Sequence, residues 1–169
     1  MNIRLAGTVG ESIVDGPGIR FTVFVQGCPH GCPGCHNPHT HDFASGEDAD
    51  TAALLEKIKA NPLLDGVTFS GGEPFCQAKA LYSLAEAIKA ETALDLMIYT
   101  GYTYEFIRSN ATEENCWMKL FSIADCVVDG KFEEAQKSYL LQFRGSANQR
   151  AIDVKKTLST GIVTEVAFD

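Results

Sequence analysis

Short apolar strands that end at glycine recur along the chain, and this pattern limits the possible folds more than any other feature. Segments rich in β-branched and aromatic residues alternate with segments whose apolar residues recur every three or four positions. This alternation is typical of βαβ units and a parallel sheet. The expected strands are 19–26, 66–70, 94–100, 125–129 and 161–168, and the expected helices are 51–60, 77–91, 104–109, 114–123 and a segment that ends near 156.

Unusual loops follow the first four expected strands. A cysteine-rich loop at 27–41 follows the first strand, and Gly71-Gly72-Glu73 follows the second. Gly101 follows the third strand, and Gly130-Lys131 follows the fourth. Parallel strands present their carboxyl ends at one edge of the sheet, where ligands bind. We therefore expect the four loops to converge on one binding site.

The composition suits one domain that spans residues 1–169, because 45% of the residues are hydrophobic and can fill a core. The formal net charge is −8, from 22 acidic and 14 basic residues. A general nucleic-acid binder needs clustered lysine and arginine side chains to replace phosphate counterions. Nucleic acid is therefore not an expected partner.

Neither a leader nor a membrane anchor is expected from the sequence. The first 18 residues lack the apolar segment of a secretory signal, and no apolar run approaches the ~20 residues that span a bilayer. We therefore expect a cytoplasmic protein without a membrane partner. Thiols stay reduced in that compartment, where clustered cysteines bind metal or do redox work rather than form disulfides.

The cysteine-rich loop reads GCPHGCPGCHNPHTH and contains Cys28, Cys32 and Cys35 with the spacing C-x3-C-x2-C. Three thiolates can hold three irons of a cubane cluster and leave the fourth iron open to an external ligand. The proline and glycine residues between the cysteines suit a tight wrap in which backbone N–H groups face sulfur.

A zinc site of the Cys3His type is the competing interpretation of this loop. Its fourth ligand would be His30, His36, His39 or His41, which are all the histidines of the chain. Structural zinc sites usually combine two separated knuckles, and this loop is a single compact cluster. The remaining cysteines, Cys76, Cys116 and Cys126, are isolated and are interpreted as small packed side chains.

The segment Ser70-Gly71-Gly72-Glu73-Pro74 lies between an expected strand and an expected helix. Glycines let the backbone approach a ligand closely. Glu73 could receive an ammonium group, and Pro74 fixes the exit of the turn. An ordinary strand-to-helix turn explains the same residues, so the segment becomes specific only together with the cysteine loop.

The cysteine loop and the Gly-Gly-Glu-Pro turn together resemble the radical S-adenosylmethionine superfamily. The stretches DGPGIR (15–20) and CHN (35–37) resemble activating enzymes of glycyl-radical proteins such as pyruvate formate-lyase. The stretches TGY (100–102), VDGKF (128–132) and RGSANQ (144–149) are most like those of the anaerobic (class III) ribonucleoside-triphosphate reductase activating family. The resemblance covers roughly residues 10–150.

One departure concerns Gly34, which stands where most superfamily members carry an aromatic residue, just before the third cysteine. This departure leaves open which residue covers the adenine of the cofactor. His36 is a candidate for that contact.

The resemblance implies an α/β fold, a partial and open (β/α) barrel with a mainly parallel sheet. It also implies that Cys28, Cys32 and Cys35 hold a [4Fe-4S] cluster and that the remaining site residues bind S-adenosylmethionine. A monovalent cation is a further candidate ligand. The candidate cofactor-binding residues are Gly34, His36, Gly71, Gly72, Glu73, Pro74, Thr100, Asp129 and Lys131.

The implied activity is the generation of a glycyl radical on the anaerobic reductase. Reductive cleavage of S-adenosylmethionine would give a 5′-deoxyadenosyl radical, with electrons from a donor such as flavodoxin. No side-chain acid or base is needed beyond cluster and cofactor. The alternatives are an activase of another glycyl-radical enzyme, a radical enzyme acting on a small molecule, and a zinc-stabilised interaction module without catalysis.

Two further segments have open roles at this stage. The turn 15–18 could help to seat the partner's glycine, or it is a plain β-turn. The stretch 144–150 could flank the cofactor, and Ser146 in it is typical of a residue that caps the start of a helix.

Overall fold

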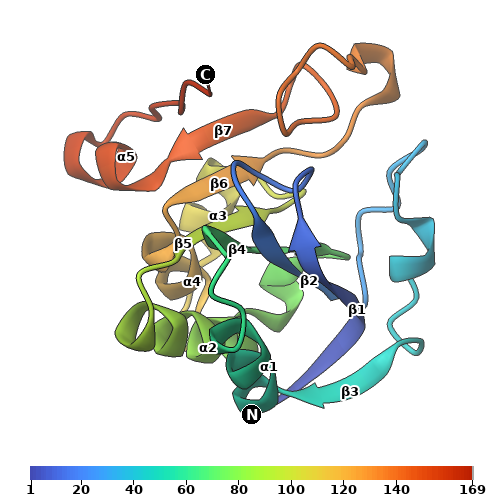
Figure 1. Cartoon of the computed structure of the whole chain (residues 1–169). Coiled ribbons are helices and arrows are strands. Elements are labelled where there is room, and N and C mark those ends of the chain that lie inside the picture. Colours follow the sequence, from blue (N-terminus) through green and yellow to red (C-terminus); the bar gives the residue numbers. More distant parts are fainter. Residues whose placement is uncertain (169) are drawn as a thin grey trace.

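The computed structural model describes residues 1–168, and within them the strands form one seven-stranded sheet in the order β3-β1-β2-β4-β5-β6-β7 (Figure 1). The strands are β1 (Asn2–Ser12), β2 (Arg20–Val25), β3 (Glu47–Asp50), β4 (Gly66–Gly71), β5 (Asp95–Tyr99), β6 (Cys126–Asp129) and β7 (Arg150–Asp153). The helices are α1 (Thr51–Lys59), α2 (Ala78–Glu91), α3 (Tyr104–Asn110), α4 (Trp117–Ile123) and α5 (Val154–Thr160), with short 3-10 turns at Pro38–Thr40, Pro74–Gln77 and Glu134–Gln136.

The middle of the sheet is parallel and its two sides are antiparallel. Strands β2, β4, β5 and β6 run in the same direction. Strand β1 pairs antiparallel with both β2 and β3, and β7 pairs antiparallel with β6. The expected α/β fold with a mainly parallel sheet is confirmed, with the antiparallel strands confined to its sides.

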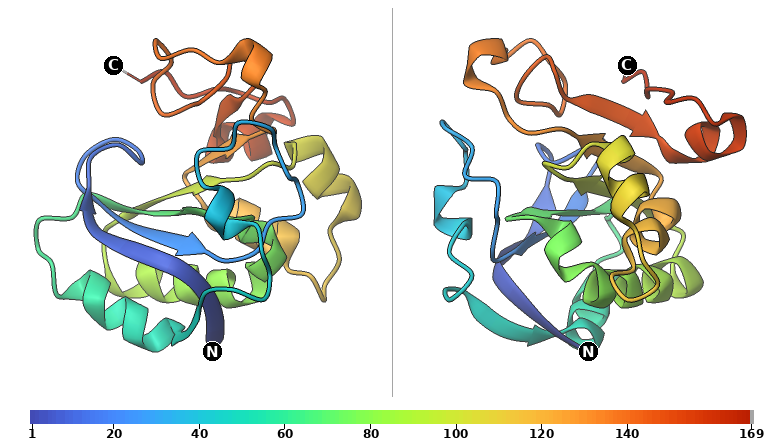
Figure 2. Two further views of the ribbon diagram at one scale, coloured as in Figure 1. Left: turned by 90° about the vertical axis from the view of Figure 1, so that its right-hand side faces the viewer. Right: turned by 180° about the vertical axis from the view of Figure 1, so that it is seen from behind.

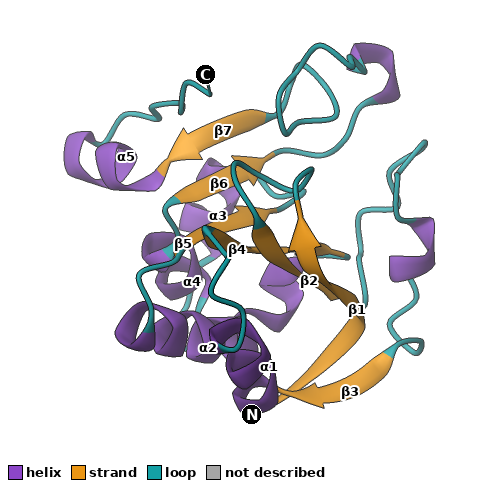
Figure 3. Ribbon diagram, in the orientation of Figure 1, coloured by secondary structure: helices purple, strands orange, loops and turns teal. Residues whose placement is uncertain are grey.

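Helices α1, α2, α3 and α4 gather on one face of the sheet, which we call the outer face (Figures 1 and 3). Helix α2 packs against both α1 and α4. Its buried residues Leu81, Leu84, Ala85 and Ile88 have the spacing that places them on one helical stripe. Helix α1 begins at Asp50, whose side chain accepts the N–H of Ala52.

Strand residues alternate between the two faces, as the pleat requires. Leu96 and Ile98 of β5 join the large core under the helices, whereas Met97 joins a second, smaller cluster with Val128 and Ala151 on the opposite face. We call this opposite face the inner face. The two views of Figure 2 show the segment from β6 to residue 168 arching over one end of the molecule.

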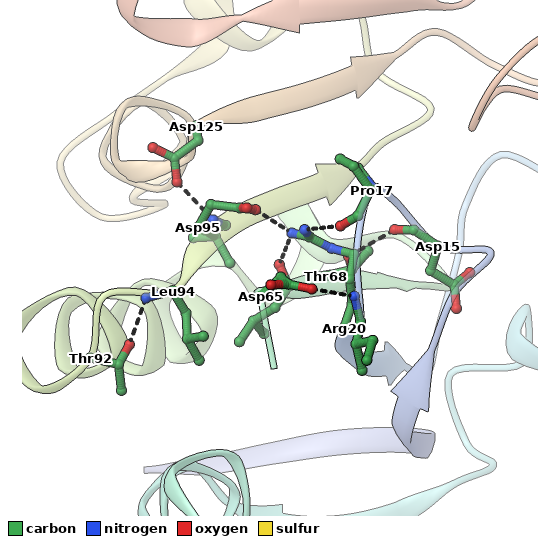
Figure 4. Close-up of polar contacts among 12 residues, drawn as sticks. Asp15, Pro17, Arg20, Asp65, Thr68, Thr92, Leu94, Asp95 and Asp125 are labelled. Carbon is green, nitrogen blue, oxygen red and sulfur yellow. Dashed lines mark hydrogen bonds and ion pairs between the residues drawn. The ribbon is translucent and has the colours of Figure 1, made fainter. Parts of the chain in front are cut away.

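Arg20 is the largest side chain buried on the inner face and is fully inaccessible to solvent. Its Nε donates to Thr68 Oγ1 at 2.7 Å, and its two terminal nitrogens donate to Pro17 O at 3.0 Å and Val67 O at 2.9 Å. A further bond of 2.5 Å reaches Asp95 (Figure 4). A single guanidinium therefore ties the starts of β2, β4 and β5 to the turn at 15–18.

The turn at 15–18 lies over the inner face and closes the hairpin between β1 and β2. Asp15 accepts hydrogen bonds from the hydroxyls of Ser12 and Thr22, and its carbonyl accepts one from Thr68. Gly16 has φ +138°, and a Cβ there would come within 2.8 Å of both the Arg20 side chain and Met97. This glycine is required for close packing as well as for its conformation.

Two sequence expectations near the C-terminus are wrong. Residues 161–168 form no strand, and a single bridge joins Glu165 to Ile152. No helix starts at Ser146, because residues 150–153 pair with β6 as β7. The cap of the following helix is Asp153, which accepts the N–H of Lys156.

Strands β1 and β3 have no counterpart among the expected elements. Strand β3 is a four-residue side strand with the sequence EDAD, mostly exposed. The expected helix 114–123 begins three residues later, at Trp117, because Cys116 adopts a left-handed conformation with φ 58°. Within residues 1–168, no helix is both long and apolar enough to cross a membrane.

Candidate functional site

The four loops that the sequence places after the parallel strands meet at one edge of the sheet. The N–H of Glu73, in the loop after β4, donates to Gly27 O at 2.8 Å in the cysteine loop after β2. The N–H of Gly101, after β5, donates to Glu73 Oε2 at 2.9 Å. The N–H of Gly130, after β6, donates to Tyr102 O at 3.3 Å. Direct hydrogen bonds therefore connect each loop to the next.

Glu73 is fully buried at the centre of this junction, and all of its hydrogen-bonding capacity is used internally. Oε1 accepts the N–H of Phe75 at 2.9 Å and the hydroxyl of Thr100 at 2.8 Å. Oε2 accepts the Gly101 N–H and lies 2.6 Å from Nε2 of His30. A carboxylate has about four lone-pair positions, so each has a partner from the protein.

His30 connects the cysteine loop to this carboxylate. Its side chain is 5% exposed and its ring packs edge-on against Tyr102, with centroids 4.5 Å apart. A Cβ on Gly101 would lie 2.4 Å from Cδ2 of the ring. Thus Gly101 leaves the space that the imidazole fills.

The three loop cysteines are free and partly exposed. The N–H of Asn37 donates to Cys35 Sγ at 3.4 Å. Burial raises the pKa of Cys28, with smaller contributions from Glu73, Cys32 and Cys35, while a backbone hydrogen bond from His30 lowers it. The thiols therefore share one neighbourhood, and donors that face sulfur suit thiolate ligands.

The loop is held at its base by its own backbone. Gly27 N–H donates to Thr40 O at 2.7 Å, and Cys28 N–H donates to His41 O at 3.2 Å. Within residues 1–168, no three His, Cys, Asp or Glu side chains are placed to share one metal ion. Cysteines that hold a cubane bind different irons, so their sulfurs are spaced more widely than the ligands of a single ion.

Gly34 and His36 lie against the loop that follows β6. A Cβ on Gly34 would meet the carboxyl group of Glu134 at 3.1 Å and the ring of Phe132 at 3.3 Å. The His36 ring is 5.2 Å from that of Phe132. An aromatic ring from a distant part of the chain thus occupies the space beside Gly34.

Asp129, at the end of β6, is 1% exposed and is committed to Arg150. It accepts Arg150 Nε at 3.0 Å and a terminal nitrogen at 2.5 Å, together with the N–H of Tyr104 at 2.8 Å. Arg150 also bonds Glu105, and the two carboxylates raise the pKa of the guanidinium further above its usual range. Arg150 was not among the candidate site residues.

A cavity of about 600 Å³ opens beside this ion pair, within the usual size range for small-molecule sites. Lys131 and Arg150 line it together with Tyr102 and Phe106. The rings of Tyr102 and Phe106 stack at 5.0 Å with an interplanar angle of 3°. Within the described residues the Lys131 side chain makes no hydrogen bond or ion pair. The carboxylates of Glu105, Asp129 and Glu133 also line the cavity, so it combines cationic, anionic and aromatic groups.

The structure brings the predicted site residues together in three groups. Gly71, Gly72, Glu73 and Thr100 meet at the junction with His30, where a Cβ on Gly72 would lie 2.3 Å from Gly27 O. Pro74 is buried and opens the 3-10 turn after β4. Gly34 and His36 form the second group with Phe132, and Asp129 and Lys131 form the third at the cavity.

Known proteins resemble this chain in sequence and in fold. The model of a 4Fe-4S single cluster domain matches residues 14–152. The anaerobic ribonucleoside-triphosphate reductase-activating protein of Vibrio cholerae is 38% identical over 146 residues, which cover 81% of this chain and 89% of that protein. The proteins of the same name from Escherichia coli K12 and from bacteriophage T4 are 37% and 31% identical, over 81% of this chain and 90% and 85% of their own lengths.

Among solved structures, QueE from Escherichia coli superimposes with a TM-score of 0.50. The match covers 61% of this chain and 54% of QueE at 21% identity. This likeness concerns the fold, and it supports the expected partial barrel.

Proposed function

The chain belongs to the family of anaerobic ribonucleoside-triphosphate reductase-activating proteins, and we propose that it generates a glycyl radical on such a reductase. The observation that carries the proposal is the junction of the cysteine loop with the loops after β4 and β5, which adds a built site to the sequence match. The proposed catalyst is a single domain, residues 1–169.

Cys28, Cys32 and Cys35 are the proposed ligands of the 4Fe-4S cluster. When bound, such a cluster would supply one electron to S-adenosylmethionine, and cleavage of the bond between sulfur and C5′ would yield methionine and a 5′-deoxyadenosyl radical. That radical would take an α-hydrogen from a glycine of the reductase, giving 5′-deoxyadenosine. The protein's part is to orient the groups and to exclude water.

The ammonium group of S-adenosylmethionine would lie at the turn of Gly71, Gly72 and Glu73, which Pro74 and Thr100 hold in place. The Glu73 carboxylate already accepts four donors. The backbone of the two glycines therefore offers the contacts that remain for the ammonium group, unless Glu73 gives up one of its internal donors.

The carboxylate of S-adenosylmethionine would face Lys131, whose ammonium group has no protein partner within the described residues. Asp129 would act through Arg150, which it orients toward the same cavity. A monovalent cation at Asp129 would compete with Arg150 for the same two oxygens. Gly34 and His36 would lie on the adenine side, next to Phe132.

The remaining partners follow from the reaction. Because the cysteine loop is partly exposed, a one-electron donor of the flavodoxin kind could approach it directly. The reaction requires neither nucleic acid nor a membrane, and we place it in the cytoplasm. The Vibrio cholerae, Escherichia coli and bacteriophage T4 relatives are each named as reductase-activating proteins. Activation of another glycyl-radical enzyme, a small-molecule substrate and a zinc module are therefore not favoured.

The test is anaerobic reconstitution with iron and sulfide, followed by dithionite and S-adenosylmethionine. The wild-type protein should produce 5′-deoxyadenosine, Cys32→Ala should not, and Cys126→Ala should behave like the wild type. Addition of the reductase should then produce a glycyl-radical signal in electron paramagnetic resonance. A protein that binds one zinc, holds no sulfide and makes no 5′-deoxyadenosine would contradict the proposal.

A further inference from the structure

We propose that His30 is a positioning residue that locks the cluster-binding loop to the ends of β4 and β5 through Glu73. The inference deepens the proposed function and rests on it where it concerns the cluster. Its structural part concerns the protein alone and can be tested without iron or cofactor.

The first observation is the bond itself. His30 lies between two proposed ligands, Cys28 and Cys32, and its Nε2 is 2.6 Å from Glu73 Oε2. Both side chains are withdrawn from solvent, at 5% and 0% exposure. An ionised carboxylate only accepts hydrogen bonds, so the imidazole N–H is the donor. A hydrogen bond to a buried charged acceptor is among the stronger ones in proteins.

The second observation is that the loop after β5 builds the space for the imidazole ring. Tyr102 covers one side edge-on at 4.5 Å. Gly101 makes room for the ring on another side, since a Cβ there would lie 2.4 Å from it. His30 is therefore joined to Cys28 and Cys32 through the chain, and to the loops after β4 and β5 through its side chain.

The third observation is that His30 shares its acceptor, Glu73, with donors from two other loops. The other donors to Glu73 are the N–H of Phe75, the hydroxyl of Thr100 and the N–H of Gly101, which all belong to the loops after β4 and β5. His30 is the donor from the cysteine loop. Glu73 thus works as an internal anchor that sets where the first two cysteines lie relative to the Gly-Gly turn.

His39 provides a matched control in the same loop. Its side chain is exposed, and its carbonyl group, which no substitution removes, accepts a hydrogen bond from Gln26. Replacing His39 with alanine changes the histidine content of the loop without touching the bond to Glu73. His30→Gln is the conservative variant, because its amide N–H reaches about as far as imidazole Nε2.

The first experiment is hydrogen–deuterium exchange, read by mass spectrometry, on the metal-free full chain. We expect His30→Ala to speed exchange about tenfold or more in peptides that cover 27–35 and 71–76, since a hydrogen bond to a charged group contributes a factor of this size. His30→Gln should restore much of the protection, and His39→Ala should match the wild type. Unchanged exchange in His30→Ala, or equal changes in His39→Ala, would overturn the inference.

The second experiment follows the cluster after anaerobic reconstitution. We expect His30→Ala to shift the electron paramagnetic resonance signal of the reduced cluster and its midpoint potential, while His39→Ala leaves both unchanged. Rescue by His30→Gln would support positioning, and a signal identical to that of the wild type would refute it. If the wild type binds no cluster but the exchange result holds, the proposed function is wrong, and the positioning of the cysteine loop by His30 is still supported.

Discussion

Replacing Arg20 with methionine is expected to lower the free energy of unfolding by about 3–5 kcal/mol. Arg20 is completely buried and donates to the Thr68 hydroxyl and to the carbonyl groups of Pro17 and Val67. Methionine keeps much of the side-chain volume, so the substitution tests the guanidinium more than the packing. The affected region is the inner face at the start of the parallel strands (Figure 4).

The magnitude follows from the acceptors that lose their donor. The guanidinium is charged, so its hydrogen bond to each acceptor contributes about 1.5–3 kcal/mol, and removing the buried charge returns part of that sum because its desolvation cost disappears. Three such acceptors give a total of about 3 kcal/mol or more. The fourth partner, Asp95, adds little because its side chain is 49% exposed and recovers water. Domains are typically stable by about 5–15 kcal/mol, so Arg20→Met would remove a large share.

Urea unfolding of the metal-free protein, followed by circular dichroism, measures the effect. Asp95→Asn is the matched control, and we expect it to cost less than about 1 kcal/mol. The dependence on urea concentration should stay unchanged in both variants. A loss below about 1 kcal/mol in Arg20→Met, or an equal loss in Asp95→Asn, would refute the account of Arg20 as a buried anchor.

Three further predictions use other contacts. Gly72→Ala would place a Cβ 2.3 Å from a carbonyl oxygen of the cysteine loop, so iron and sulfide per chain after reconstitution should fall several-fold. Gly10→Ala, where the added Cβ meets open space and the backbone φ is not positive, should retain them. Burial raises the pKa of the Cys126 thiol to about 12. The stability that this neutral thiol contributes is complete below the thiol pKa of the unfolded chain and is lost as pH rises toward 12. The free energy of unfolding should therefore fall by on the order of 1 kcal/mol from pH 9 to 10, as measured by urea unfolding, and by less in Cys126→Ala. Asp129→Asn should cost about 2 kcal/mol in urea unfolding because Arg150 loses a charged acceptor, and a loss below about 0.5 kcal/mol would contradict that pairing.

The elements with strong local patterns were predictable from the sequence. Helix α2 matches the expected segment because its apolar residues repeat at helical spacing over four turns. Strands β2, β4, β5 and β6 were also expected, since each is an apolar run that ends at or near a glycine. Their parallel order followed from the helical segments between them, which leave no short hairpin connection.

Strands whose stability depends on distant partners were not predictable. Strand β1 contains Gly7 and Gly10 and has many exposed residues, so its apolar pattern is weak. It is a strand because it pairs with β2 on one side and β3 on the other. Segment 161–168 shows the opposite case: its β-branched residues suit a strand, but only Glu165 forms a bridge to β7.

The candidate site also combines local motifs, which the sequence predicts, with contacts between distant residues, which it does not. The cysteine spacing and the Gly-Gly-Glu-Pro turn are local motifs, and the structure brings the two segments together. The contact of His30 with Glu73 joins residues 43 positions apart, and no pattern near either residue indicates it. The pairing of Asp129 with Arg150 spans 21 positions and was missed for the same reason.

Strand β3 has a consequence for self-association. A side strand exposes unpaired N–H and C=O groups that can template pairing with another chain. Here the exposed side is only four residues long and carries the acidic sequence EDAD. A second copy that added its own β3 would bring carboxylates together at one strand spacing, about 4.8 Å. Repulsion between like charges at that distance disfavours edge-to-edge association through β3.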